Sequence, residues 1–204
     1  MQSYLVIATK NQKKLKEIKE ILRRLDLKIT SLADYPHPPR IIENGKTFRA
    51  NAIKKAIRIA RFAKKLTLGE DSGLCVDALG GKPGVHSSRF AGKNKSDRQN
   101  NLKVLRLLGD LALPKRKARY VCAVAIADKE GLVGAAEGSC GGLIAFAPRG
   151  HSGFGYDPLF IIPKYKKTFA QLGEKIKHRM SHRCHALRKA EKILRKYVEQ
   201  KGSN

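Results

Sequence analysis

Hydrophobic positions in the first third of the chain follow two different periods. Tyr4–Ala8 is a short, continuously apolar run, which predicts a buried strand. From Asn11 to Leu25 apolar residues recur every three or four positions, the spacing of an amphipathic helix. Thr47–Lys65 repeats this helical spacing, and the proline-containing segment Asp34–Arg40 is predicted to be a loop. The opening of the chain therefore predicts a strand followed by two helices.

The second half of the chain changes from helical spacing to alternation. A third helix is predicted at Ser96–Leu111, ended by Gly109, and Ser181 is a suitable N-cap for a last helix. Between them the pattern predicts a series of strands: Ala118–Ile126, Leu132–Ala136, Leu143–Phe146 and Pro158–Ile162. Early strand–helix units followed by a run of strands predict an α/β fold with a mixed sheet. Since no linker interrupts residues 1–204, we expect a single domain.

Glu70-Asp71-Ser72-Gly73 is the most informative stretch. The apolar residues Leu66 and Leu68 lead into two adjacent carboxylates, a hydroxyl and a glycine. We expect a strand that delivers acidic ligands and turns at once, so that the backbone can approach a phosphate. The simplest interpretation is a divalent-metal site; a solvated turn is the alternative.

The net charge of the chain limits the classes of ligand that it is expected to bind. The chain has 43 Lys and Arg against 17 Asp and Glu, a formal charge of +26. This excess of positive charge indicates either an anionic ligand such as RNA or a nucleotide, or a generally basic proteome. The basic residues are dispersed along the chain and not gathered in one tail. No apolar run approaches the roughly 20 residues of a membrane span, so we expect a cytoplasmic protein. The four cysteines are far apart and are expected to be reduced.

Two segments near helix starts suit phosphate. Thr9, Asn11 and Lys14 lie where the first strand meets the first helix, and a helix N-terminus attracts anions. Asn51 and Lys55 are four residues apart and so share one helix face, with Glu43 shortly before them as a further carboxylate. A polar helix cap and a solvated charged face, respectively, are the alternatives.

Two later segments suit a nucleobase. Gly153-Phe154-Gly155-Tyr156-Asp157 holds aromatic side chains on a glycine-rich backbone, which suits base stacking, and Asp157 can accept hydrogen bonds. A structural tight turn is the alternative. Lys177, His182 and Arg183 surround the start of the last helix. Positive charge is mildly unfavourable at a helix start, which favours a functional interpretation.

In this order the segments resemble the inosine triphosphate pyrophosphatase family, whose members hydrolyse non-standard purine nucleoside triphosphates. The resemblance extends from Thr9 to Leu187. It is carried by six motifs: Thr9-x-Asn11-x-x-Lys14, Glu43-x-Gly45-x-Thr47-Phe48-x-x-Asn51-Ala52-x-x-Lys55-Ala56, Glu70-Asp71-Ser72-Gly73-Leu74, Asp77-Ala78-Leu79-x-Gly81-x-Pro83-Gly84-Val85, Gly153-Phe154-Gly155-Tyr156-Asp157-Pro158 and Lys177-x-x-x-Ser181-His182-Arg183.

The resemblance implies an α/β protein with a long central mixed β-sheet, flanking helices and two lobes with the active-site cleft between them, assembled as a homodimer. It implies Mg²⁺-dependent hydrolysis of ITP, dITP and XTP to the monophosphate and pyrophosphate. Asp71 would bind metal and act as general base, with Glu43 and Glu70 assisting the metal. The residues that would bind substrate are Thr9, Asn11, Lys14, Asn51, Lys55 and Ser72 toward the phosphates, and Phe154, Gly155, Tyr156, Asp157, Lys177, His182 and Arg183 toward the base or neighbouring phosphate.

Two other classes remain open. The sister family of septum-formation-type nucleotide pyrophosphatases has a similar fold and another base preference, but Thr9-x-Asn11-x-x-Lys14 and Ser181-His182-Arg183 argue against it. A basic, non-catalytic RNA-binding protein is the second. Glu43, Glu70 and Asp71 argue against that, because carboxylates repel a phosphate backbone unless a metal intervenes. We therefore expect no specific nucleic-acid partner and no membrane partner.

Overall fold

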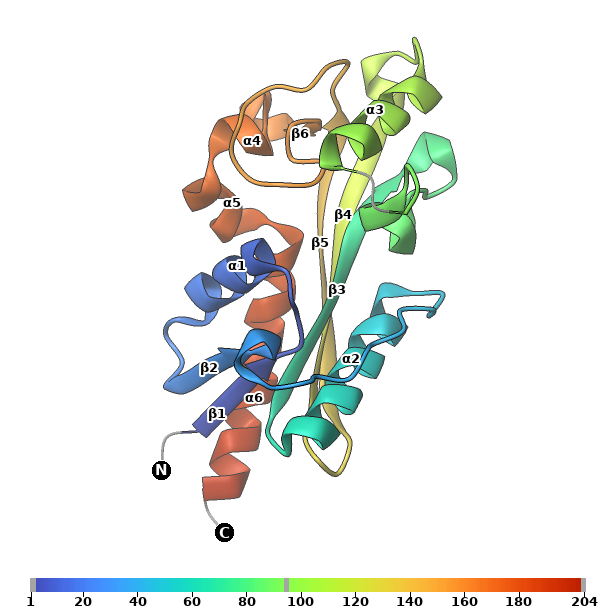
Figure 1. The fold of residues 1–204 in the computed structure, drawn as a ribbon. Coiled ribbons are helices and arrows are strands. Elements are labelled where there is room, and N and C mark those ends of the chain that lie inside the picture. Colours follow the sequence, from blue (N-terminus) through green and yellow to red (C-terminus); the bar gives the residue numbers. More distant parts are fainter. Residues whose placement is uncertain (1–2, 94–95, 203–204) are drawn as a thin grey trace. The chain divides into compact units, whose positions relative to one another are not determined.

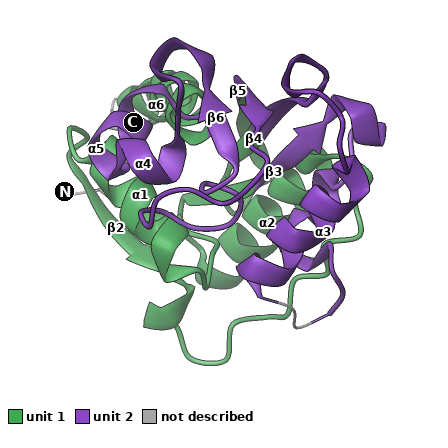
Figure 2. Cartoon of the chain, turned by 90° about the horizontal axis from the view of Figure 1, so that it is seen from above, with its two compact units in different colours: residues 1–71, 122–138, 183–204 green, residues 72–121, 139–182 purple. Residues whose placement is uncertain are grey.

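The computed structural model describes residues 3–93 and 96–202 and divides into two compact units (Figure 2). Unit 1 comprises residues 1–71, 122–138 and 183–204, and unit 2 comprises residues 72–121 and 139–182. The boundaries between the two units fall within three strands and in the first turn of the last helix. Within the described residues, no helix combines the length and apolarity needed to cross a membrane. The expectation of a single domain stays a prediction.

One mixed sheet runs through the chain in the order β2-β1-β3-β4-β5-β6-β7 (Figure 1). β1 pairs in parallel with β2 and β3, whereas β6 pairs antiparallel with β5 and β7. The mixed α/β class predicted from the sequence is thus confirmed. The strands are β1 (Ser3–Ile7), β2 (Leu27–Ser31), β3 (Thr67–Val76), β4 (Lys117–Ala127), β5 (Leu132–Ile144), β6 (Phe160–Ile162) and β7 (Lys167–Thr168).

The helices begin where the sequence places their caps. Asn11, Thr47 and Ser96 each accept a backbone hydrogen bond from the first turn of the helix that follows, and α6 begins directly after Ser181. The helices are α1 (Gln12–Leu22), α2 (Phe48–Ala63), α3 (Asp97–Leu108), α4 (Phe169–Leu172), α5 (Glu174–Met180) and α6 (His182–Gly202).

In unit 1 the sheet is covered by helices on both faces. Leu5 and Ile7 of β1 belong to a buried cluster with apolar residues of α1 and α6. Val6, the residue between them, packs in another cluster with Ile59 of α2. Since successive residues of a strand point to opposite faces, α1 and α6 cover one face and α2 covers the other (Figure 1).

Unit 2 has its own apolar core. Leu74 of β3, Val104 of α3, Tyr120 of β4 and Phe160 of β6 belong to one buried cluster. The rings of Tyr120 and Phe160 lie 4.6 Å apart, centroid to centroid. Aromatic and aliphatic burial therefore fixes α3 and the segment around β6 against the same strands.

Two of the expected strands are in fact one. Leu132–Ala136 and Leu143–Phe146 were predicted as separate strands, and the residues between them include three glycines. The structure contradicts this: β5 runs without a break, with Ala136, Gly138 and Cys140 buried in alternation. A Cβ at Gly142 would lie 2.5 Å from the Ile161 carbonyl oxygen, so this glycine permits close strand packing instead of a turn.

The expected turn at Gly73 is also wrong. β3 continues through Ser72 and Gly73 to Val76, and the chain turns only at the short helix Asp77–Leu79. Residues 73–76 are all buried, and β4 is a neighbour of β3 in the sheet, so extended backbone is favoured past the carboxylates. No element was predicted from the sequence at β2, β7, α4 or α5, which are short or polar.

Gly69 sets the contact between β3 and α2. A Cβ at this position would lie 2.3 Å from the Ala52 carbonyl oxygen and 2.6 Å from the Ala56 nitrogen, both backbone atoms of α2. We expect Gly69→Ala to lower the free energy of unfolding by about 1–3 kcal/mol or more, because the helix must move away. Urea denaturation measures this.

Gly141→Ala in β5 is the matched control, since its Cβ would meet no atom within 4 Å. It should leave the urea midpoint unchanged or raise it slightly. Equal midpoints for the Gly69 and Gly141 variants would contradict the proposed close approach of α2.

Candidate functional site

The start of α1 forms the first polar element of unit 1. The Asn11 amide donates to Thr9 Oγ1 at 3.1 Å, and Asn11 Oδ1 in turn accepts from the Lys14 amide at 3.1 Å. In the register of the sheet, Ile7 of β1 lies opposite Leu68 of β3, so β3 extends beyond the carboxyl end of β1. Its next residues, including Glu70, therefore continue toward the start of α1, which the sequence predicted as a phosphate site.

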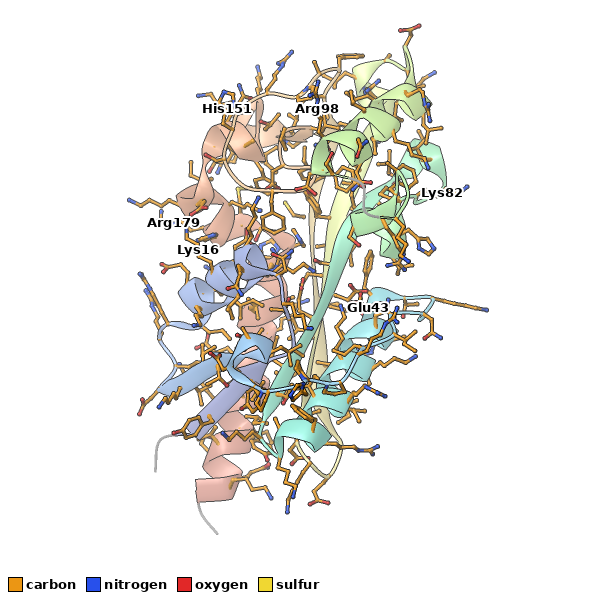
Figure 3. The ribbon with its side chains drawn as sticks, viewed as in Figure 1. Lys16, Glu43, Lys82, Arg98, His151 and Arg179 are labelled. Carbon is orange, nitrogen blue, oxygen red and sulfur yellow. The ribbon has the colours of Figure 1, made fainter. Side chains whose placement is uncertain are left out.

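Asp71 lies on the face of β3 that α2 covers. Asn51 Nδ2 donates to Asp71 Oδ2 at 2.9 Å, and Lys55 Nζ lies 3.4 Å from Asp71 Oδ1. The same Lys55 ammonium lies 3.0 Å from Oε2 of Glu43, which precedes α2 (Figure 3). The sequence placed Asn51 and Lys55 on one helix face toward phosphate, and the structure directs both at the buried Asp71 carboxylate.

Burial determines the protonation behaviour of this group. Burial raises the pKa of Asp71 above its usual value, although Lys55 and Asn51 oppose the shift. Burial alone would lower the pKa of Lys55, but the carboxylates of Asp71, Glu43 and Glu70 outweigh it and raise that pKa. Lys55 therefore stays charged, and Asp71 is a stronger base than an exposed aspartate.

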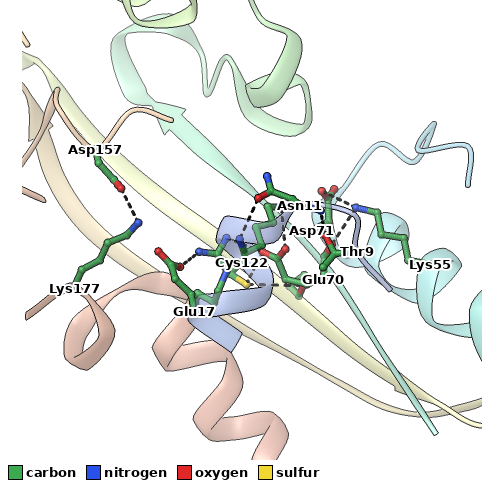
Figure 4. A network of polar contacts seen from close by, with 12 residues as sticks. Thr9, Asn11, Glu17, Lys55, Glu70, Asp71, Cys122, Asp157 and Lys177 are labelled. Atoms are coloured by element: carbon green, nitrogen blue, oxygen red, sulfur yellow. Dashed lines mark hydrogen bonds and ion pairs between the residues drawn. The ribbon is translucent and has the colours of Figure 1, made fainter. Parts of the chain in front are cut away.

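Glu70 lies on the opposite face of β3, between α1 and α6. Its Oε2 is 2.8 Å from Lys14 Nζ, and its Oε1 accepts from Arg183 Nη2 at 3.1 Å (Figure 4). Arg183 Nη1 also donates to Glu17 of α1, and Cys122 Sγ lies 3.4 Å from Glu70 Oε1. The Glu70 carboxylate is therefore neutralised from two helices at once.

Arg183 forms buried ion pairs with Glu17 and Glu70, which the sequence did not suggest. Its side chain is 1% exposed. Burial would lower its pKa, but Glu70 and Glu17 reverse the shift and raise it. The unfavourable placement of positive charge at a helix start is thus offset by two carboxylates. Its predicted contact with the base or a phosphate stays a prediction.

Glu17 and Cys122 were not among the sequence candidates. Glu17 follows Lys14 by three positions and so shares its helix face, a spacing that could have identified it. Cys122 gives no such signal, because only the pairing of β4 with β3 brings it beside Glu70. All four cysteines are buried, and no disulfide joins any of them.

The acidic residues of unit 1 fit a magnesium ion better than a metal held by protein alone. Within residues 3–93 and 96–202, no group of three His, Cys, Asp or Glu side chains could by itself hold a metal. Mg²⁺ typically takes one or two carboxylates and completes its shell with water and substrate phosphates. Asp71 and Glu43, which share Lys55, match this donor set; Glu70 would have to give up an ion pair.

In unit 2 the Gly153–Asp157 segment is a turn built around a carboxylate. Asp157 Oδ2 accepts from the Phe154 amide at 2.9 Å and lies 2.6 Å from Lys177 Nζ, and both charged side chains are buried (Figure 4). The Lys177 ammonium also lies 4.5 Å from the centre of the half-buried Phe154 ring. The segment is therefore a structural turn, and base binding by the same residues stays a prediction.

The other predicted residues of unit 2 have different surroundings. His182 stacks on Tyr120 at 4.5 Å, and the Tyr120 hydroxyl lies 3.4 Å from Asp157 Oδ1. Tyr156 is buried, and its hydroxyl donates to the Ser87 carbonyl oxygen at 2.7 Å, so its side chain supports the fold. Ser72 is half-buried in β3. Tyr120 was not a sequence candidate.

Comparison with known proteins identifies the family. The Ham1 family model matches residues 5–193. A dITP/XTP pyrophosphatase from Desulforamulus reducens is 48% identical over 197 residues, covering 96% of this chain and 98% of the relative. One from Bacillus anthracis is 47% identical over 93% of this chain and 95% of the relative. The chain therefore belongs to the Ham1 family, and the resemblance inferred from the sequence is confirmed.

Solved structures agree with this assignment. A HAM1 protein from Coxiella burnetii superposes with a TM-score of 0.85 at 38% identity, covering 95% of this chain and 99% of that one. The Staphylococcus aureus Ham1 protein gives a TM-score of 0.83 at 36% identity, over 98% of this chain and 100% of that one. The mixed α/β sheet is thus the fold of relatives whose structures are known.

The Arg183 ion pairs generate a prediction about stability. Arg183→Met leaves the buried carboxylates of Glu17 and Glu70 without this counter-charge, so the free energy of unfolding should fall by about 3–5 kcal/mol. Urea denaturation without nucleotide measures the effect. Arg195→Met on the same helix removes an exposed pair with Glu191 and should change stability by less than about 1 kcal/mol. Similar losses in both variants would contradict the assigned role.

Proposed function

We propose that this protein hydrolyses non-standard purine nucleoside triphosphates, dITP, ITP and XTP, to the monophosphate and pyrophosphate. The observation that carries the proposal is the buried Asp71 carboxylate, which Asn51 and Lys55 hold and whose pKa burial raises. A fixed carboxylate of this kind suits activation of a water molecule. The names of the two bacterial relatives, dITP/XTP pyrophosphatase, support the same reaction.

The phosphates are bound, on this proposal, by unit 1. Thr9, Asn11 and the first turn of α1 supply hydroxyl, amide and backbone N–H donors. The Lys14 side chain is 18% exposed and has three N–H donors, of which Glu70 needs one. Lys55 is the further predicted phosphate contact of unit 1, and Ser72, which belongs to unit 2, stays a predicted contact. Positive charge near the leaving pyrophosphate lowers the barrier to its departure.

We further propose Mg²⁺ as the cofactor, held by Asp71 and Glu43 with a contribution from Glu70. When bound, it would neutralise phosphate charge and lower the pKa of a coordinated water. Asp71 would then accept a proton from the attacking water, while Asn51 and Lys55 keep its carboxylate in position. Lys55 also limits the repulsion between Asp71 and Glu43.

Unit 2 supplies the contacts with the base. The half-buried Phe154 ring would stack on a purine, with Gly155 and Asp157 shaping the turn that carries it. A 6-keto purine presents an acceptor where adenine presents a donor, so a hydrogen-bond donor such as Lys177 or His182 would favour hypoxanthine and xanthine. Arg183, which belongs to unit 1, keeps its contact with the base or a neighbouring phosphate as a prediction. Asp157 holds the Lys177 ammonium in place.

The alternatives from the sequence are less favoured. The closely similar relatives bear the name dITP/XTP pyrophosphatase, which supports neither the septum-formation-type family nor a non-catalytic RNA-binding protein. The homodimer and the cytoplasmic location expected from the sequence stay predictions.

The proposed reaction is tested by pyrophosphate release from a panel of nucleotides. We expect turnover of dITP, ITP and XTP in Mg²⁺, with kcat/KM for ATP lower by about a hundredfold, which corresponds to the cost of leaving one buried donor without a partner. Chelation with EDTA should abolish release, and added Mg²⁺ should restore it. Equal turnover of ATP and ITP, or full activity in EDTA, would contradict the corresponding part of the proposal.

The role of Asp71 is tested by Asp71→Asn. The amide keeps the size of the side chain but removes the anionic ligand and base, so kcat for ITP should fall on the order of a hundredfold or more. Asp110→Asn, at an exposed position after α3, is the matched control and should retain wild-type kcat. Substantial turnover by the Asp71 variant, with its fold intact by circular dichroism, would refute the assignment.

A further inference from the structure

Gly155 is held on both sides by side chains of α3. Its amide donates to Asp97 Oδ2 at 2.7 Å, and its carbonyl oxygen accepts from Asn101 Nδ2 at 3.0 Å. We propose that Asp97 and Asn101 are positioning residues, which act through Gly155 to fix the Phe154 ring for base binding. This inference rests on the proposed function and assigns a role to α3, which none of the six sequence motifs includes.

We call the two hydrogen bonds from Asp97 and Asn101 to Gly155 the α3 clamp, and the geometry of the helix suits it. Asp97 and Asn101 are four residues apart, so both project from one face of α3. They bind two consecutive peptide groups of the turn, the N–H and the C=O that flank the Gly155 Cα. Gly155 has a positive φ of 63°, and glycine has the widest backbone freedom of any residue. The clamp therefore acts at the position where the turn would otherwise be freest.

The helix that provides the clamp is itself fixed. Ser96 and Gln99 cap its first turn reciprocally, and Val104 and Leu108 are buried in the core of unit 2. Asn100, 2% exposed, accepts from the Ala91 amide at 2.7 Å. The first two turns of α3 thus offer a stable reference against which the Gly153–Asp157 turn is held.

The clamp complements the contacts made inside the turn. Asp157 holds the Phe154 amide and pairs with Lys177, which lies over the Phe154 ring. A Cβ at Gly153 would lie 2.1 Å from Asp157 Oδ2, so this side of the turn is closely packed. Asp157 therefore fixes the turn from within, and α3 fixes it from the opposite end. Phe154, between Gly153 and Gly155, depends on both.

The experiment compares four variants. Asp97→Ala and Asn101→Ala each remove one hydrogen bond to Gly155. Asp97→Asn keeps an acceptor oxygen but removes the charge at the helix start, so it separates the hydrogen bond from the helix-dipole effect. Arg98→Ala, on the same turn of α3 and exposed, is the matched control (Figure 3).

The first measurement is hydrogen exchange by mass spectrometry, which needs no catalytic activity. Loss of one such hydrogen bond should speed exchange of the peptide covering residues 150–160 by about tenfold in both alanine variants. Exchange in α2 should not change. Asp97→Asn and Arg98→Ala should match the wild type. Unchanged exchange in both alanine variants, or equal acceleration in Asp97→Asn, would overturn the clamp.

The second measurement is steady-state hydrolysis of dITP. Because the clamp acts on the base-binding ring and not on Asp71, KM should rise about tenfold in the alanine variants while kcat stays within about threefold. Faster exchange with an unchanged KM would overturn the positioning role. If the wild type itself did not hydrolyse dITP, the proposed function would fail, whereas the exchange data would still decide whether α3 holds the turn.

Discussion

Two adjacent carboxylates inside a buried strand impose a strict requirement for counter-charge. Successive side chains of β3 point to opposite faces, so Glu70 and Asp71 form their direct ion pairs with different cations. Glu70 points to the face covered by α1 and α6, where Lys14 and Arg183 meet it. Asp71 points to the face covered by α2, where Asn51 and Lys55 meet it. The placement of α1, α2 and α6 in unit 1 provides cationic or polar partners for both carboxylates. A buried charge without a partner would strongly destabilise the fold.

The same requirement prepares the site for chemistry. Each carboxylate is fixed by donors from rigid helices, so little reorganisation is needed when a charged substrate arrives. The close approach of α2 to β3 at Gly69 brings Lys55 within 3.4 Å of Asp71 and 3.0 Å of Glu43. Burial also raises the pKa of Asp71, which makes it a better proton acceptor. Stability and the proposed reactivity therefore depend on the same packing.

Unit 2 also contains a buried carboxylate that needs a counter-charge, and here a turn provides part of it. Asp157 is buried, and it satisfies its charge with Lys177 and with the backbone of the turn that contains it. Lys177 in turn lies over Phe154, so one ion pair orders an aromatic ring that stays half-buried. Asp97 and Asn101 bind the next peptide groups from outside. A ring held in this way loses little conformational freedom on stacking against a base, which favours binding.

The sequence by itself determined the features that depend on neighbours along the chain. Helix starts at Asn11, Thr47 and Ser96 follow from local capping, and the helical spacing of α2 already directs Asn51 and Lys55 to one face. Only the tertiary structure decided which cations meet Glu70, that Glu17 and Cys122 join them, and that β5 passes straight through its glycines. These outcomes rest on pairing between residues far apart in sequence: Arg183 and Glu70 are 113 positions apart, and no local pattern records such a contact.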